Sequence, residues 1–335
     1  MDKDTLINVQ GLKTWFFTDE GIVKAVDGVD FSIKQGKTLC VVGESGCGKS
    51  ITARSIMRLI ELPGKIVEGT IKMAGKDGSE IDLTTLSSKG KEIRQIRGAE
   101  ISMIFQEPMS SLSPVHTIGN QLAETIRLHL DTSKEKARAR SIEVLKEVGI
   151  PKAEQRLDSY PFELSGGMRQ RVMIAMALSC RARLLIADEP TTALDVTTQA
   201  NILDLISGLQ KEYNMSVMFI THDLGVVAEI ADEAVVMYLG KVVERGPVDA
   251  IFHDPKHPYL VSLLKSIPKL STGTTEQLDS IRGMVPHPFN RPGGCAFHPR
   301  CDKAVKGLCD AGLPPKVSFG PDREVSCFLY REGTS

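Results

Sequence analysis

The sequence contains 335 residues, of which 41% are hydrophobic and 25% charged, as in a globular protein with one large or two modest domains. The net charge is −1, so the composition indicates no strongly basic face for nucleic acid. The first residues, Met1–Asp4, lack the apolar core of a secretory signal, and no segment is apolar over the length that spans a bilayer. We therefore expect a soluble or peripheral protein.

The first part of the chain predicts short β-strands separated by glycine turns. The expected strands are Leu6–Val9, Val29–Ile33 and Thr38–Val42, with turns at Gly11, Gly21, Gly28 and Gly36; similar runs continue over residues 69–82. An aromatic triplet, Trp15-Phe16-Phe17, lies within this part. An aromatic ring here can stack on an adenine or pack in the core, and the sequence leaves both interpretations open.

A glycine-rich turn follows the third strand and precedes a helix expected over Ile51–Ile60, before Pro63. The turn and the first helical residue read Gly43, Glu44, Ser45, Gly46, Cys47, Gly48, Lys49, Ser50 and Ile51. This order of strand, turn and helix is the context that makes the pattern a phosphate site. Backbone N–H groups curl around the anion, Lys49 reaches the β- and γ-phosphates, and Ser50 offers its hydroxyl to Mg²⁺.

The pattern becomes helical after a strand at Ile101–Phe105, which is followed by Gln106. We expect a helical insertion over about residues 107–164. Within it, Thr132–Glu135 predicts a capping box, and Gly149 and Pro151 end the helix that follows.

The segment Leu164–Arg171 opens another helix, expected to extend to about Cys180. Ser165 is the expected N-cap, and Gly166 and Gly167 leave the first N–H groups uncovered by side chains. The sequence therefore predicts a second helix N-terminus suited to a phosphate.

An apolar strand that begins at Leu184 ends in two adjacent carboxylates, Asp188 and Glu189. Neighbouring strand residues point to opposite faces, so the two carboxylates cannot serve the same role. Asp188 is placed to hold Mg²⁺ through water, and Glu189 to polarise a water for attack on the γ-phosphate. A later strand, Ser216–Ile220, leads to His222, for which we expect a γ-phosphate contact.

The last part of the predicted core is a hairpin of Ala234–Tyr238 and Lys241–Glu244, joined through Gly240. Strands that alternate with helices predict an α/β fold with a parallel, three-layer sheet. Cys40 and Cys180 lie in apolar elements and are expected in the core. Cys47 is expected to serve as a small residue of the turn, although a thiol there could make the protein sensitive to thiol reagents, with nucleotide as protection.

Together these segments resemble an ATPase subunit of an ABC transporter over roughly residues 5–250. The matching motifs are the phosphate loop Gly43–Ser50, the Q-loop Gln106, the signature Leu164–Gln170, the Walker B segment to Glu189, the D-loop Ala193-Leu194-Asp195 and the switch His222. The resemblance implies a P-loop NTPase cassette with an N-terminal antiparallel β subdomain, a helical insertion and a small C-terminal extension. It divides the chain at about 1–250 and 251–335.

The resemblance also implies the roles of the site residues. ATP would be the ligand, with Phe16 or a neighbour on the adenine, and Mg²⁺ would be held by Ser50, Gln106 and Asp188. Catalysis would depend on Glu189, His222, Gln106 and Lys49. Two cassettes would close head-to-tail, with Ser165, Gly166, Gly167 and Asp195 of one facing the phosphate loop of the other. Gln106 and the helical insertion would contact two membrane subunits.

The last 85 residues are similar to the tail of oligopeptide/dipeptide permease ATPases, in Ile251–Tyr259 and again in Arg291–Cys301. Four cysteines, Cys295, Cys301, Cys309 and Cys327, follow the family's tail, where some members carry a [4Fe-4S] cluster. Four thiolates suit such a cluster or a structural Zn²⁺, and the absence of a C-x₂-C pair favours the cluster. Disulfides are a third interpretation and unligated thiols a fourth.

These features predict the ATP-hydrolysing subunit of an importer for di- or oligopeptides on the cytoplasmic membrane face. Its partners would be a second cassette, identical or a paralogue, two membrane permease subunits, and an extracellular binding protein indirectly. An importer for another solute, such as nickel or a sugar, is the first alternative. A soluble ABC ATPase of DNA repair or translation is the second, but the chain lacks the long coiled coil and the second cassette of those proteins.

Overall fold

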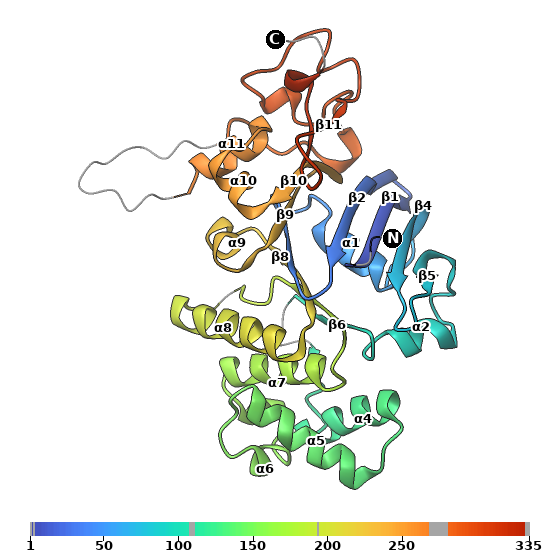
Figure 1. Ribbon diagram of the computed structural model, residues 1–335, viewed down its shortest axis with the longest axis vertical. Helices are drawn as coiled ribbons and strands as arrows, with labels where there is room; N and C mark the ends of the chain where they lie inside the picture. The colour runs from blue at the N-terminus through green and yellow to red at the C-terminus, as the bar shows by residue number, and fades with distance from the viewer. Residues whose placement is uncertain (1, 3, 107–110, 193, 268–280, 332–335) are drawn as a thin grey trace, which may run out of the picture.

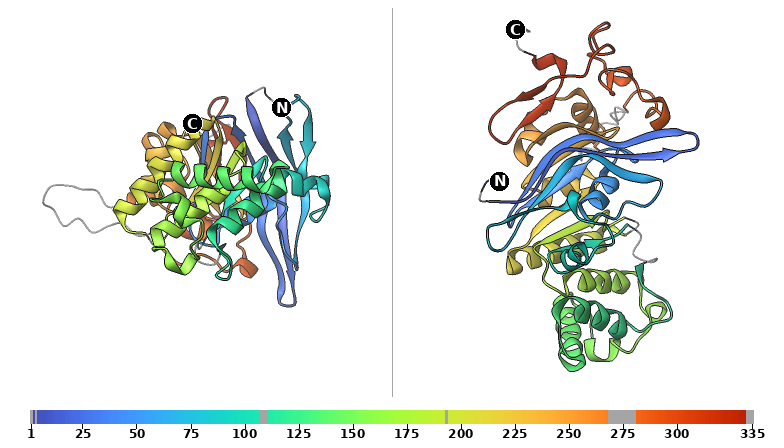
Figure 2. Two further views of the ribbon diagram at one scale, coloured as in Figure 1. Left: turned by 90° about the horizontal axis from the view of Figure 1, so that it is seen from below. Right: turned by 90° about the vertical axis from the view of Figure 1, so that its right-hand side faces the viewer.

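The computed structural model describes residues 2, 4–106, 111–192, 194–267 and 281–331. In this part of the chain, two β-sheets are flanked by helices, with the helical insertion at one end of the long axis and the C-terminal extension at the other (Figure 1). Figure 2 shows the smaller sheet as a separate layer beside the helices.

The smaller sheet is antiparallel and has the strand order β2-β1-β4-β5. Its strands are β1 (Thr5–Thr18), β2 (Gly21–Lys34), β4 (Gly64–Ala74) and β5 (Glu80–Asp82). Gly21 and Gly36 lie at turns as predicted, but the predicted turns at Gly11 and Gly28 are wrong. Both glycines lie at register shifts inside the long β1–β2 pair, with φ angles of 56° and 84°. A β-bulge absorbs such a backbone without ending the strand.

The larger sheet has the order β11-β12-β10-β9-β3-β8-β7-β6. Its strands are β3 (Thr38–Val42), β6 (Ile101–Ile104), β7 (Leu184–Asp188), β8 (Ser216–Thr221), β9 (Glu233–Tyr238), β10 (Lys241–Pro247), β11 (Lys316–Ser318) and β12 (Glu324–Ser326). The five strands from β9 to β6 are parallel, and β10 forms the predicted hairpin with β9. Two strands of the extension continue the same sheet, because β12 pairs with β10 at Glu244 and Val325.

The helices expected after the glycine-rich turn, in the helical insertion and after Ser165 are present, with differences at their ends. They are α1 (Lys49–Ile56), α2 (Lys91–Ile96), α4 (Ile118–Leu130), α5 (Lys134–Glu147), α6 (Ala153–Arg156), α7 (Gly166–Leu178), α8 (Val196–Tyr213), α9 (Leu224–Ile230), α10 (Val248–His253) and α11 (Pro258–Lys265). Helix α1 ends at Ile56 rather than Ile60, since Arg58 takes a φ of 55° that breaks the helix. The cap of α5 is Ser133, which accepts from the Lys136 N–H, and not Thr132.

The larger sheet separates two hydrophobic cores, and this explains its unbroken apolar strands. In β3, Cys40 and Val42 face the core formed with the helices, whereas Leu39 and Val41 face the core that includes the antiparallel sheet. A strand buried on both faces needs apolar residues at every position. The three-layer α/β fold of the prediction is confirmed, and Cys40 and Cys180 are buried as expected.

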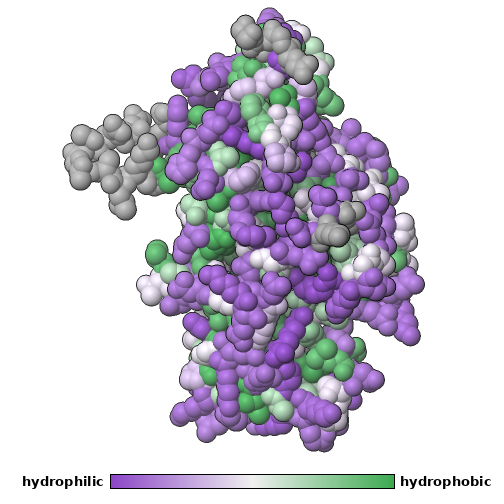
Figure 3. Space-filling model, in the orientation of Figure 1, coloured by the Kyte–Doolittle hydropathy of each residue, from purple (hydrophilic) through white to green (hydrophobic). Residues whose placement is uncertain are grey.

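The surface seen in Figure 3 is mostly hydrophilic, with scattered apolar patches. Among the described residues, no helix is long and apolar enough to cross a membrane.

Candidate functional site

The loop between β3 and α1 is shaped by glycines that allow close backbone contacts. Gly43 and Gly48 have φ angles of 150° and 102°, and a side chain on them would collide with the carbonyls of Met237 and Ala25. Lys49 Nζ donates to the carbonyl oxygens of Gly43, at 2.7 Å, and Glu44, at 3.2 Å. The lysine side chain thus folds back over the carbonyl oxygens of its own loop.

Ser50 and Asp188, each expected to serve Mg²⁺, meet at the start of α1 and the end of β7. The Ser50 hydroxyl donates to Asp188 Oδ1 over 2.9 Å. Asp188 is 1% exposed, and this burial raises its pKa although the Ser50 bond opposes the shift. A hydroxyl and a carboxylate are oxygen donors that suit Mg²⁺, which binds through few protein groups and completes its shell with water and phosphate. The donor set therefore fits Mg²⁺.

Glu189 gathers three polar partners beyond Asp188. Gln106 Nε2 donates to Glu189 Oε2 at 3.3 Å, the Thr192 hydroxyl donates to the same oxygen at 3.0 Å, and His222 Nδ1 lies 3.5 Å from Oε1. Gln106, Glu189 and His222 follow the carboxyl ends of the adjacent strands β6, β7 and β8. The structure therefore brings together Gln106, whose role the family resemblance implied, and the strand-end residues Glu189 and His222. The contact of Thr192 with Glu189 was not predicted. Its position three residues after Glu189 was the only sequence feature that could have indicated it.

The Glu189 backbone has a φ of 47°, which is rare for a residue with a side chain. Its N–H donates to the Ile220 carbonyl over 3.0 Å, so the turn is fixed to the neighbouring strand. Strain of this kind persists where surrounding contacts hold it. Here the contact with β8 holds the Glu189 backbone, and so the position of the carboxylate that has Gln106 and His222 as neighbours.

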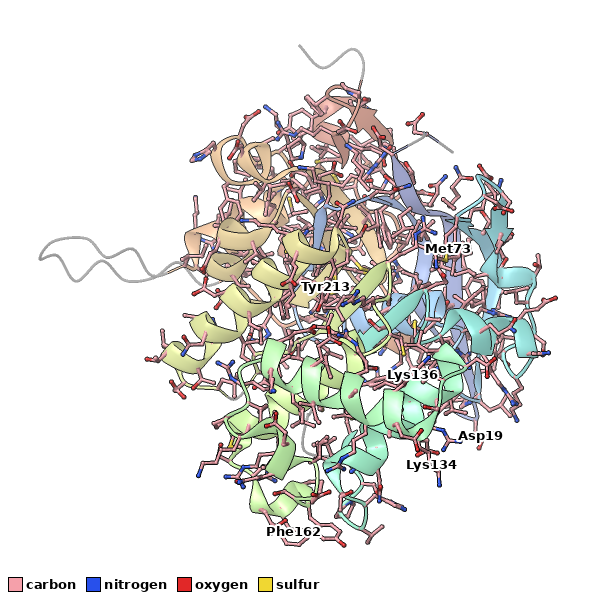
Figure 4. The ribbon with its side chains drawn as sticks, turned by 60° about the horizontal axis from the view of Figure 1, so that its bottom comes forward. Asp19, Met73, Lys134, Lys136, Phe162 and Tyr213 are labelled. Atoms are coloured by element: carbon pink, nitrogen blue, oxygen red, sulfur yellow. The ribbon has the colours of Figure 1, made fainter. Side chains whose placement is uncertain are left out.

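The Leu164–Gln170 segment lies apart from the phosphate loop. The Ser165 hydroxyl caps α7 by accepting from the Met168 N–H at 3.3 Å, which confirms the predicted cap. Ser165 and Gly166 are exposed, and among the described residues no hydrogen bond or ion pair joins them to Gly43–Ser50. The start of α7 is thus open to a ligand or partner from outside the chain. Phe162 protrudes nearby with 69% exposure (Figure 4).

Two further predicted site residues have local structural partners. Asp195 caps α8 by accepting from the Thr198 N–H and hydroxyl, at 3.0 and 2.7 Å, and these bonds lower the pKa of its carboxyl. Ala193 lies outside the described residues. Phe16 pairs with Val23 and Gly64 across β1, and its ring fills the space that a side chain on Gly64 would need. Its stacking on adenine stays a prediction.

The four tail cysteines line one cavity of about 350 Å³ in the C-terminal extension. All seven cysteines are free, so the disulfide interpretation finds no support among the described residues. Burial raises the pKa of Cys295 and Cys301, and that of Cys327 to about 11. Within the described residues, no three side chains of His, Cys, Asp or Glu lie close enough together to hold one metal ion.

Glu44 has a role that the sequence did not reveal. Its carboxylate accepts two hydrogen bonds from Arg300, at 2.7 and 3.0 Å, and its N–H donates to the Tyr259 hydroxyl at 2.9 Å. Both partners belong to the C-terminal extension and follow Glu44 by more than 200 residues. No local pattern could have indicated them.

Known proteins are similar to this chain in sequence and in fold. A sequence model described as ABC transporter matches residues 26–192, and one described as the C-terminal region of oligopeptide/dipeptide transporters matches residues 243–309. The oligopeptide transport ATP-binding protein AppD of Bacillus subtilis is 52% identical, with 98% of each chain covered. The dipeptide transport ATP-binding protein DppD of Escherichia coli is 46% identical, with 96% of each covered.

Among solved structures, the dimeric cassette MJ0796, titled a bacterial ABC transporter cassette, has a TM-score of 0.63 and 28% identity. The match covers 72% of this chain and 99% of that one. A second structure of MJ0796 is titled as a post-hydrolysis state bound to ADP and Pi, and it matches with the same TM-score and coverage.

Proposed function

Because the chain belongs to the oligopeptide/dipeptide family of ABC transporter ATP-binding proteins, we propose that its phosphate loop binds ATP and that Glu189 activates the water that hydrolyses it. The chain is the ATPase of a peptide importer. The observation that carries the residue roles is the cluster of Gln106, Glu189 and His222 beside the Ser50–Asp188 pair.

The chemistry needs charge neutralisation and an oriented water. Backbone N–H groups of the loop and Lys49 hold the β- and γ-phosphates, and Lys49 leaves its carbonyl partners for them. Ser50 and Asp188, with Gln106 nearby, would hold Mg²⁺, which would supply charge neutralisation at the phosphate oxygens. Glu189 accepts a hydrogen bond, and then the proton, from the attacking water. His222, 59% exposed at its side chain, is free to turn from Glu189 to the γ-phosphate.

The open start of α7 supports a head-to-tail dimer of cassettes. Ser165, Gly166 and Gly167 offer uncovered N–H groups at a helix N-terminus, where an anion is stabilised. Among the described residues, no hydrogen bond or ion pair joins them to the phosphate loop of the same chain, so in this proposal a second cassette supplies the missing half of each site. Asp195, at the start of α8, lies on the same partner-facing side in this proposal. Closure around ATP and release after hydrolysis drive two membrane subunits through Gln106 and the helices α4–α6.

The cargo is a di- or oligopeptide, delivered by an extracellular binding protein to the permease subunits, and the ATPase acts at the cytoplasmic face. Transport is tested by uptake of a labelled dipeptide and a labelled tripeptide into cells that carry the complete transporter. We expect uptake with the unaltered chain and none with Glu189→Gln at the same expression level. Uptake of Ni²⁺ or a sugar in place of both peptides would identify the alternative importer.

The four-cysteine cavity is proposed to hold a [4Fe-4S] cluster, with Zn²⁺ as the alternative. Four unpaired thiols on one cavity wall support a shared ligand. In the part of the chain that the structure describes, no three potential ligands are close enough for a single ion, whereas the iron atoms of a cluster allow the thiolates to lie farther apart. In that case Cys295, Cys301, Cys309 and Cys327 are the ligands, and the cluster ties residues 295–327 of the extension together.

Metal analysis after anaerobic purification tests this proposal. A brown protein with about four Fe per chain supports the cluster, and stoichiometric Zn without colour supports the zinc site. Cys301→Ser is expected to lower the metal content. Cys180→Ser is the matched control, because it alters a buried cysteine that is distant in sequence from the four tail cysteines. If the unaltered chain contains neither Fe nor Zn, both forms of the proposal are contradicted.

A further inference from the structure

The C-terminal extension contacts the cassette around the nucleotide loop. Arg300 and Tyr259 contact Glu44, Arg291 donates to Asp27 Oδ2 at 3.0 Å, and Phe289 lies against Gly21 at the start of β2. The extension lies above β9, β10 and the end of β2 in Figure 1. It is therefore positioned to act on the loop that receives the phosphates.

Glu44 places a negative charge in a loop built to bind an anion. A carboxylate beside bound phosphates repels them, unless a cation offsets its charge. Arg300 does this with two parallel hydrogen bonds, and its side chain is only 5% exposed. A bidentate pair that is largely withdrawn from water is stronger and better oriented than a surface ion pair.

Arg300 is itself held in place from several directions. Its Nε donates to the Arg282 carbonyl at 3.1 Å, and one terminal nitrogen also reaches the Tyr238 hydroxyl at 3.4 Å. Its guanidinium lies about 6 Å from the rings of Tyr238 and Phe297. The guanidinium is thus fixed by the extension before it meets Glu44.

Glu44 passes this constraint to the rest of the loop through its backbone. Its N–H is bound by the Tyr259 hydroxyl, and its carbonyl accepts from the Cys47 N–H and from Lys49, both at 3.2 Å. The side chain, N–H and carbonyl of this residue are all engaged. Moving Glu44 would therefore disturb the lysine that contacts the phosphates.

We propose that Arg300 is a positioning residue of the nucleotide site, which neutralises Glu44 and, with Tyr259, holds the phosphate loop ready for ATP. The inference rests on the proposed function, because it takes ATP as the ligand. Arg300 does not contact the reacting atoms in this proposal. It acts through Glu44, so it contributes to ATP affinity more than to the chemical step.

The test measures ATP binding by the full-length chain, purified with its metal content determined and its folding checked by circular dichroism. Arg300→Gln is expected to weaken ATP binding about tenfold, within the usual range of coupling between sites. Adding Glu44→Gln to Arg300→Gln should restore most of the affinity, because the loop then carries no unpaired carboxylate. In the assembled transporter, Arg300→Gln should raise KM for ATP and leave kcat nearly unchanged.

Arg282→Gln is the matched control, since this arginine lies in the same extension and its side chain is 83% exposed. Unchanged ATP affinity in Arg300→Gln, or no recovery in the double variant, would overturn the proposal. If Arg300→Gln does not fold, Tyr259→Phe decides: it keeps the ring packing on Tyr238 and Phe297 but frees the Glu44 N–H. Wild-type affinity in Tyr259→Phe would then overturn the proposal.

Failure of the inference is distinguishable from failure of the proposed function. Loss of ATP binding in Lys49→Ala together with wild-type binding in Arg300→Gln would reject the inference and keep the nucleotide site. An unaltered chain that binds no ATP would reject the nucleotide site itself.

Discussion

The hydrogen bond from Ser50 to Asp188, 2.9 Å long, joins the start of α1 to the end of β7 across the two central motifs of the site. This bond partly compensates the cost of burying the Asp188 carboxylate, which is almost completely withdrawn from water. Burying a charge without a full counter-charge is unfavourable, and a Mg²⁺ ion held by Ser50 and Asp188 would remove this cost.

Asp188→Asn is expected to raise the thermal stability of the chain without Mg²⁺ and nucleotide at pH 7, by about 2 °C or more. Burial raises the pKa of Asp188 above its unfolded value of about 3.9, so the folded state binds the proton more tightly. Stability is then lost as pH rises from the unfolded pKa through the folded one. Asparagine lacks this cost, and it can still accept the Ser50 bond.

The gain from Asp188→Asn should shrink as pH falls, because protonation of the native carboxyl removes the cost of burying its charge. Melting curves from pH 4 to 8 measure this, with the exposed Asp204→Asn on α8 as control. Mg²⁺ with ATP should stabilise the unaltered chain more than the variant. A variant less stable than the parent at pH 7 without Mg²⁺ would contradict the burial argument.

Glu189→Gln is expected to keep ATP and Mg²⁺ binding and to lose roughly 10²–10⁴-fold in hydrolysis, the usual effect of removing a general base. Glutamine preserves the shape and can still accept from Thr192, but it cannot take the proton of the attacking water. ATP binding is measured on the isolated chain and hydrolysis on the assembled transporter. Glu92→Gln, an exposed glutamate on α2, is the control. Normal hydrolysis by Glu189→Gln would show that Glu189 is not the general base.

The sequence predicted those parts of the site that depend on local order. Lys49 and Ser50 follow a strand and a glycine turn, and Asp188 ends an apolar strand. The family resemblance implied that Gln106, Glu189 and His222 serve one site; the three follow the carboxyl ends of adjacent parallel strands and lie together.

What the sequence did not predict depends on distant contacts or on backbone detail. Glu44 binds Arg300, 256 residues later in the chain, and no periodicity connects them. Gly11 and Gly28 predicted turns because glycine allows positive φ, but a bulge within a strand uses the same freedom. The pairing of β12 with β10 also had no local signal, since three-residue strands carry too little pattern.

Cys47 is expected to react slowly with thiol reagents, in contrast to the sensitivity that its position in the loop suggested. It is 3% exposed, and burial raises the pKa of its thiol, so little thiolate is present at neutral pH. Labelling with a maleimide, followed by mass spectrometry of the loop peptide, should show a rate far below that of free glutathione. The rate should increase with pH above neutrality. Rapid labelling at pH 7 that ATP prevents would contradict the burial of this thiol.

Arg323→Gln is expected to destabilise the chain by about 3 kcal/mol, the lower end of the cost of leaving a buried charge without its partner. Glu244, fully buried on β10, accepts from Arg323 at 3.1 Å and from the N–H groups of Lys256 and His257. Arg323 follows β11 in the extension, so this contact holds the extension on the larger sheet. Urea unfolding at pH 7 measures the loss.

The loss in Arg323→Gln should diminish at low pH. Burial already raises the pKa of Glu244, and removal of the arginine raises it further, so the variant's carboxyl becomes neutral earlier as the pH falls. Adding Glu244→Gln should recover part of the stability, because no unpaired charge then remains. Arg282→Gln, which removes a solvent-exposed ion pair with Asp302, should cost less than about 1 kcal/mol. Equal losses in Arg323→Gln and Arg282→Gln would show that the buried pair does not hold the extension in place.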